Sequence, residues 1–169
     1  ISFIPVDEYG VINLNLLEKE INPETILITI MHANNEIGTI QPIESISEIA
    51  KKHNILFHTD AAQSVGKYPT DVQKMGVDLL SIAGHKLYAP KGVGALYIRD
   101  GIILEKLIHG ADHEQNKRAG TENVLEIVGL GNACEIAKRD MNKNLDNLKY
   151  LRDLLHKNLI RKIPELKLN

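Results

Sequence analysis

The stretch ILFHTDAAQS, residues 55–64, decides the fold, because a predicted strand, residues 55–59, begins there with three apolar residues and is followed by polar side chains. A helix is predicted just before it, over residues 42–53, from apolar residues at helical spacing behind Pro42. Residues 25–33 precede that helix, are rich in Ile and Thr, and are apolar on both faces. This favours a central strand of a covered sheet.

Further strands are predicted on both sides of this region. Residues 61–76 form a connection that leads to a strand at residues 77–83, and residues 95–98 form one more strand. Upstream, residues 1–12 are expected to form two short strand pieces around a polar turn, and residues 14–21 a helix. Strands that alternate with helices are typical of parallel βαβ units, so the predicted fold class is α/β with a mostly parallel sheet and flanking helices.

Two long helices are predicted at the C-terminal end, one over residues 123–139 and a second one that runs until Pro164. We expect residues 1–139 to be part of one domain and residues 140–169 to be a helix leading toward a second, smaller domain. The second helix carries a leucine stripe that we expect to pack on the rest of a larger protein: Leu148, Leu151, Leu155 and Leu159.

Composition excludes several classes of protein. With 169 residues, 43% of them hydrophobic, the chain can bury one ordinary core, and its net charge of −2 argues against a nucleic-acid or anionic-membrane binder. No apolar run approaches the roughly 20 residues of a membrane helix. A single cysteine, Cys134, is typical of a reducing compartment, which favours the cytoplasm or an organelle matrix. Because the sequence opens at Ile1 in a strand-like run, we expect a piece of a longer protein.

Polar side chains follow each of the three predicted parallel strands. Ligands bind beyond the carboxyl ends of the strands in such sheets, so these residues are expected to meet in one crevice. Within the second set, His58 and Asp60 should lie on the same side of their strand, because side chains alternate. The sets are His32, Asn34 and Asn35; His58, Asp60 and Gln63; and Ser81, His85 and Lys86.

Two kinds of site could use these residues. A metal site would take the histidines and Asp60 as ligands, but the ammonium group of Lys86 beside them would repel a divalent ion. The other kind centres on Lys86, since a partly desolvated lysine amine can bond to the aldehyde of pyridoxal phosphate. Asp60 would then keep the ring nitrogen protonated. Ser81 and His85 would supply donors to the phosphate beside the lysine.

Four motifs carry a specific resemblance. They are MHANNEIG at residues 31–38, HTDAAQS at 58–64, SIAGHK with the following PKGVG at 81–94, and RAGTEN at 118–123. In this order and at this spacing they resemble the cysteine desulfurase family of class V aminotransferase-like enzymes. The resemblance implies part of the large domain of a fold type I pyridoxal phosphate enzyme, and it covers less than half of a family member.

Transferred residue by residue, the resemblance assigns cofactor-binding roles. Lys86 is the catalytic lysine that bonds to the cofactor aldehyde, and Asp60 is the partner of the pyridine nitrogen. Gln63 donates a hydrogen bond to the ring hydroxyl oxygen. The same comparison makes Ser81 and His85 phosphate ligands.

The resemblance also implies a homodimer and a reaction. Thr121 corresponds to a residue that reaches the phosphate in the neighbouring subunit's site, and Asn34 to one close to the cofactor and the substrate carboxylate. Family members remove sulfur from L-cysteine, giving L-alanine and an enzyme persulfide that serves iron–sulfur cluster assembly or other sulfur transfer to an acceptor protein. The persulfide-forming cysteine is expected outside this sequence, so the chain alone should be inactive.

Several alternatives stay open at this stage. Selenocysteine lyases share the motifs, and a non-catalytic scaffold could retain them by descent. The segment HGADHE, residues 109–114, departs from the glycine-rich run of many relatives. By themselves, His32 and His58 are expected to be hydrogen-bonded structural residues, and Cys134 a small core residue on a helical face with Ile127. Thr121 could equally cap the helix that follows it.

Overall fold

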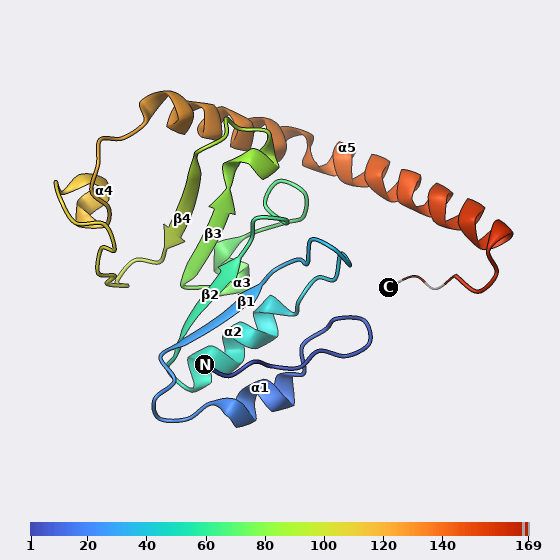
Figure 1. Ribbon diagram of the computed structural model, residues 1–169, viewed down its shortest axis with the longest axis horizontal. Helices are drawn as coiled ribbons and strands as arrows, with labels where there is room; N and C mark the ends of the chain where they lie inside the picture. Colours follow the sequence, from blue (N-terminus) through green and yellow to red (C-terminus); the bar gives the residue numbers. More distant parts are fainter. Residues whose placement is uncertain (167, 169) are drawn as a thin grey trace.

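The computed structural model describes residues 1–166 and 168, and Figure 1 shows a sheet with short helices beside it and one long helix across its end. Residues 84–87 form a single 3-10 turn, labelled η1 here. In chain order the elements are α1 (Leu14–Glu20), β1 (Leu27–Met31), α2 (Ile43–Lys52), β2 (Leu56–Asp60), α3 (Val72–Met75), β3 (Leu79–Ala83), η1 (Gly84–Leu87), β4 (Gly94–Ile98), α4 (His113–Asn116) and α5 (Val124–Lys162).

The strands lie in the order β1-β2-β3-β4. β1 is parallel to β2 and β2 to β3, whereas β4 pairs with β3 in the antiparallel sense. The predicted α/β fold with a mostly parallel sheet is confirmed. The expectation that the strand within residues 25–33 is central is wrong for the described residues, because β1 lies at the edge of the sheet, where Leu27 is 43% exposed.

One face of the sheet packs against α2. Phe57 and Leu80 are buried on that face, and Ile46 of α2 is fully buried against them. The helix turns an apolar side to the sheet because its apolar residues recur every three or four positions. Side chains alternate along a strand, so His58 and Ser81 stand on the opposite face. The polar groups of interest are thereby kept out of the main hydrophobic core.

At the N-terminal end, the structure confirms the predicted helix but does not form the two predicted strand pieces as strands. Residues 14–21 contain α1, capped by the side chain of Asn13, which accepts a hydrogen bond from the backbone N–H of Leu16. The two expected strand pieces within residues 1–12 amount to one bridge between Val6 and Ile12. This segment therefore forms a loop closed by one bridge beside the sheet.

The two predicted C-terminal helices form one continuous helix, α5, so the prediction of two is wrong. Residues 138–150 contain neither Pro nor Gly, and nothing in their chemistry stops a helix. The helix does end before Pro164, as expected. Its C-terminal half extends beyond the rest of the molecule (Figure 1), and three leucines of the predicted stripe are exposed there: Leu148, Leu151 and Leu155.

The first half of α5 packs on the segment that follows β3. Leu130 and Ala133 are buried against Leu87, and Cys134 is half-buried beside them. Ile127 is not on this buried side, as the sequence pattern suggested, but is 42% exposed. None of the described helices is both long and apolar enough to cross a membrane.

Candidate functional site

The carboxyl ends of β1, β2 and β3 lie side by side, as the sequence predicts. Asp60 is the last residue of β2, and it is aligned with Met31 of β1 and with Ser81 of β3. One carboxylate oxygen, Oδ1, accepts the backbone N–H of Ala62 at 2.9 Å. The second oxygen has no hydrogen-bond partner among the described residues, and the side chain is exposed. A negative charge with a free oxygen therefore stands at this edge of the sheet.

His58 lies on the same face as Asp60, as the alternation predicts, and it is held by two hydroxyl groups. Its Nδ1 is 2.6 Å from Thr29 Oγ1, and its Nε2 is 2.9 Å from Ser81 Oγ. Burial lowers the pKa of His58, while the charge of Asp60 opposes this shift. The expectation of a hydrogen-bonded structural histidine is confirmed for His58, and the hydroxyl of Ser81 is engaged by it.

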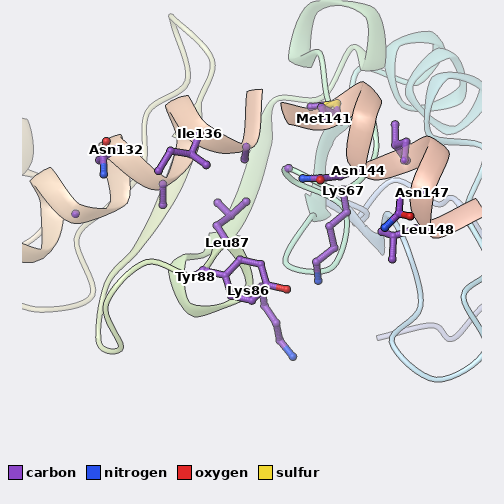
Figure 2. Close-up of a pocket in the computed structure, with 15 residues that line it drawn as sticks. Lys67, Lys86, Leu87, Tyr88, Asn132, Ile136, Met141, Asn144, Asn147 and Leu148 are labelled. Carbon is purple, nitrogen blue, oxygen red and sulfur yellow. The ribbon is translucent and has the colours of Figure 1, made fainter. Parts of the chain in front are cut away.

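Lys86 and His85 follow β3 directly in η1. Lys86 is half-buried and His85 exposed. Figure 2 shows the Lys86 amine extending away from α5, as does that of Lys67. Within the described part of the chain, no carboxylate lies within ion-pair distance of the Lys86 amine. This amine is thus available to an electrophile, as a lysine that bonds to an aldehyde must be.

A cavity of about 420 Å³ lies between η1, the turn at residues 66–67 and α5 (Figure 2). Of the candidate residues, only Lys86 lines it, together with Lys67 and several asparagines of α5. Among the described residues, no acidic side chain lines the cavity, so these residues offer no partner there for a protonated ring nitrogen. We therefore locate the candidate site at the strand ends, beside Asp60, and not in this cavity.

Two other predicted site residues, Asn34 and Gln63, differ in the hydrogen bonds that their side chains make. Asn34 Oδ1 accepts the backbone N–H groups of Glu36 and Ile37, at 2.8 and 3.0 Å, so its amide oxygen shapes the turn after β1. Gln63 is half-buried, and its amide has no side-chain hydrogen bond to the rest of the described chain. Gln63 is thereby free to donate to a ligand, whereas the amide nitrogen of Asn34 already donates to Met31 Sδ at 3.5 Å.

Thr121 lies on an exposed loop before α5 and is not the cap of that helix. Asn123 caps it instead, accepting from the backbone N–H of Glu126. The segment before this loop is irregular: three successive residues after His113 have positive φ, from 50° to 63°. His113 Nδ1 lies 2.8 Å from a carboxylate oxygen of Glu122, which ties the segment to the start of α5. The Thr121 hydroxyl itself has no partner in the described part of the chain.

His32 has surroundings that the sequence does not predict. Its side chain is buried, and its Nδ1 has no hydrogen-bond partner, so a hydrogen-bonded role is wrong for this nitrogen. The ring meets Tyr68 edge-on, with 5.7 Å between ring centroids, and burial lowers the pKa of His32. His32 thus packs the turn after β1 against the loop that carries Gln63.

The donor set suits pyridoxal phosphate better than a metal ion. In the described ranges, no three His, Cys, Asp or Glu side chains gather closely enough to hold a metal. An unpaired amine on Lys86, a carboxylate oxygen free on Asp60 and an exposed imidazole on His85 match the aldehyde, ring nitrogen and phosphate of the cofactor. The residues present therefore fit this group.

Comparisons with known proteins agree with this assignment of the fold. The family model described as aminotransferase class V matches residues 1–169. Among curated proteins, a cysteine desulfurase IscS of Dictyoglomus turgidum is 53% identical over 169 residues, which is 100% of this chain and 43% of that protein. A probable mitochondrial cysteine desulfurase of Dictyostelium discoideum is 47% identical over 171 residues, covering 100% of this chain and 38% of that protein.

Solved structures also resemble this chain in fold. A NifS-like protein superimposes with a TM-score of 0.90 at 44% identity, over 95% of this chain and 44% of the other. A structure of SspA in complex with cysteine gives a TM-score of 0.77 at 50% identity, over 79% of this chain and 39% of the other. The chain thus spans less than half the length of the relatives that it matches.

Proposed function

The chain belongs to the class V aminotransferase family, and we propose that it forms part of the cofactor-binding domain of a pyridoxal-phosphate-dependent cysteine desulfurase. One structural relationship carries the proposal. The free carboxylate oxygen of Asp60 lies at the end of β2, next to β3, and β3 leads directly into η1 with Lys86. The similarity to proteins named cysteine desulfurases, at 47 to 53% identity in the two relatives above, supports cysteine as the substrate.

Each side chain has a distinct task in this proposal. When bound, pyridoxal phosphate supplies a protonated ring that accepts the electron pair left on the substrate Cα. Asp60 contributes the negative charge that keeps a proton on the ring nitrogen. Lys86 would hold the cofactor at its aldehyde carbon, and its Nζ would accept the proton from the substrate Cα. Gln63 would donate to the ring hydroxyl oxygen, and Ser81 and His85 would donate to the phosphate.

Cys134 is not the sulfur-accepting thiol in this proposal. It is half-buried on α5, and burial raises the pKa of its thiol, so little thiolate forms near neutral pH. Sulfur transfer requires a thiolate that attacks the substrate sulfur. We assign that role to a cysteine outside this sequence, in which Cys134 is the only one.

Three further parts of the proposal concern the whole protein. We infer from the resemblance of the RAGTEN motif a homodimer in which Thr121 completes the neighbouring site. The Thr121 side chain is exposed in the described chain, as this role requires. The product persulfide would pass to a sulfur-acceptor protein, for example in iron–sulfur cluster assembly. Residues 140–169 would lead toward a second, smaller domain. A reducing compartment, either the cytoplasm or an organelle matrix, suits a thiol-based reaction.

The experiment is reduction of the purified, intact protein with borohydride, followed by peptide mapping. Pyridoxal phosphate should be fixed on Lys86, and Lys86→Ala should remove the label. Lys67→Ala is the matched control, because Lys67 lines the same cavity and also extends its amine away from α5. A label on Lys67 or elsewhere, or a purified protein that takes up no cofactor, contradicts the proposal, and the second result would favour the scaffold alternative.

A further inference from the structure

The loop that carries Thr121 is held on both sides of this residue. On the upstream side, Ala119 is buried, and its backbone N–H donates to the carbonyl of Ile108 at 3.3 Å. On the downstream side, the carboxylate of Glu122 contacts His113, whose Nδ1 lies 2.8 Å from Glu122 Oε1. Thr121 itself is exposed between these two anchors. Its position therefore depends on contacts that its neighbours make.

The charge of Glu122 fixes the direction of this hydrogen bond. The pKa of Glu122 is lowered, first by a hydrogen bond from its own backbone N–H, then by His113 and by the charge of Arg118, so the carboxyl is ionised near neutral pH. An ionised carboxylate can only accept, so Nδ1 of His113 carries a proton and donates. Hydrogen bonds to a charged acceptor are stronger than those between neutral groups, so this one can hold two half-buried side chains together.

The chain that follows His113 has an unfavourable conformation. Three successive residues other than glycine have φ from 50° to 63°: Glu114, Gln115 and Asn116. The left-handed region is unfavourable for residues with a Cβ, and they adopt it singly rather than in runs. Such a turn persists only where the surrounding contacts hold it. Lys106 supplies one of them, since its Nζ lies 2.6 Å from Asn116 Oδ1, and the bond from His113 supplies another at the opposite end of the turn.

We propose that His113 is a positioning residue for Thr121 and acts through Glu122. The imidazole holds the carboxylate, and the carboxylate fixes the residue next to Thr121, so that the threonine hydroxyl is presented to the cofactor phosphate in the neighbouring subunit's site. This inference rests on the proposed function, because the role of Thr121 in a homodimer is part of it. It extends the shared site to the segment HGADHE, residues 109–114, which lies upstream of the RAGTEN motif.

The first test compares two forms of the cofactor in the His113→Ala variant of the intact protein. Without the imidazole, Glu122 is released, and the Thr121 hydroxyl is no longer held toward the phosphate. The affinity for pyridoxal phosphate should fall on the order of tenfold, as for loss of one hydrogen bond to a charged group. The affinity for pyridoxal, which lacks the phosphate, should stay unchanged. Thr121→Ala should give the same pattern, whereas a general loss of stability would lower both affinities.

Conservative variants separate the hydrogen bond from the bulk of the ring. In His113→Asn, the amide nitrogen stands as many bonds from the backbone as Nδ1 does, so it can donate to Glu122 in place of the imidazole. In Glu122→Gln, the amide oxygen still accepts from Nδ1. Either variant should therefore keep a higher affinity for pyridoxal phosphate than His113→Ala. A loss in both conservative variants as large as that in His113→Ala would overturn the proposal.

His53→Ala is the matched control, because it removes the same kind of bond elsewhere. His53 Nε2 lies 2.9 Å from Glu18 Oε1, and these side chains are 32% and 35% exposed, against 30% and 39% for His113 and Glu122. The contact joins the end of α2 to α1 and does not involve the Thr121 loop. His53→Ala should leave both cofactor affinities unchanged, whatever its effect on Tm.

A mixed dimer shows which site His113 serves. When Lys86→Ala and His113→Ala protomers are combined, the one remaining Lys86 belongs to the His113→Ala protomer. Its borohydride label should appear at the cofactor concentration that the parent protein needs, because the Thr121 that completes this site comes from the other protomer. A label that needs the higher concentration of the His113→Ala homodimer would contradict the proposal.

Failure of the proposed function looks different from failure of this inference. The unsubstituted protein would then carry no borohydride label on Lys86 at any cofactor concentration. A labelled protein whose Thr121→Ala variant binds both cofactor forms normally would remove the assigned role of Thr121, and the role of His113 with it. If Thr121→Ala weakens only the binding of pyridoxal phosphate, unchanged affinities in His113→Ala would overturn the positioning role alone.

Discussion

Gly84 and Val93 approach each other so closely that only glycine fits at position 84. The backbone N–H of Gly84 donates to the carbonyl of Val93 at 3.1 Å, and a Cβ at position 84 would lie 2.6 Å from that oxygen. Gly84 begins η1, the turn that carries His85 and Lys86. The contact therefore ties the turn that carries the candidate lysine to the chain entering β4.

Gly84→Ala should consequently displace η1. We expect a loss of stability of about 1–3 kcal/mol, as for other overpacked sites, and weaker covalent attachment of pyridoxal phosphate at Lys86. Thermal unfolding and borohydride labelling measure the two effects. Gly131→Ala is the control, because nothing lies within 4 Å of a Cβ there, and alanine in a helix should be neutral or slightly stabilising. Full labelling and an unchanged Tm in Gly84→Ala would mean that η1 does not depend on this contact.

The sequence predicts the strand ends well because local chemistry determines them. Apolar runs that change to polar residues mark the ends of β2 and β3, and the period of two places His58 and Asp60 on one face. It cannot reveal that Ser81 and Thr29 both bond to His58, because this depends on the register of three strands that are far apart in sequence. The sequence carries one signal for this contact: a histidine lies two residues before Asp60, and a threonine lies on the preceding strand.

Errors in the predicted fold have similar causes. β1 is apolar on both faces, which is typical of a central strand, yet no strand pairs with its outer edge among the described residues. The break predicted after residue 139 has no basis in the residues there, which all tolerate a helix. The predicted burial of Ile127 is wrong because helical periodicity identifies the apolar face of a helix. It does not show how far along the helix the segment that covers this face extends.

Asp60→Asn should impair catalysis far more than cofactor binding. The substitution removes the charge that keeps the ring nitrogen protonated, while Lys86 and the phosphate donors remain. We expect alanine formation from cysteine to fall by on the order of 100-fold, as for loss of one preorganised electrostatic partner, and affinity for pyridoxal phosphate to fall by less than about tenfold. Steady-state kinetics and cofactor titration of the intact protein provide both values. Equal losses would contradict the assigned role of Asp60.

Cys134→Ser should leave sulfur transfer in the intact protein unchanged. Because burial raises the pKa of the Cys134 thiol, the reactive thiolate is scarcer in the folded than in the unfolded protein near neutral pH, and it increases only as pH rises above the ordinary thiol range. Alkylation of Cys134 should therefore be slow at pH 7, faster in alkaline buffer and fastest after unfolding. Mass spectrometry of alkylated peptides measures these rates. Loss of persulfide formation in Cys134→Ser would show that this thiol is the nucleophile.

Mixing two impaired variants tests whether Thr121 serves the neighbouring subunit. Thr121 is exposed, and its hydroxyl has no partner in the described chain, whereas Lys86 belongs to its own subunit's η1. In a heterodimer of Lys86→Ala and Thr121→Ala protomers, both substitutions fall in one shared site if Thr121 crosses the interface. The other site then has both native residues.

The mixed dimer should therefore regain about half of the native activity per dimer, although each parent variant is impaired. Unfolding and refolding the mixture allows subunits to exchange, and two different affinity tags isolate the heterodimer before the assay. A Cys134→Ser protomer mixed with Lys86→Ala provides a matched control, because that pair leaves one native site whichever subunit supplies Thr121. If Thr121 acts within its own subunit, each site of the test dimer keeps one substitution, and activity stays at the mean of the two parents.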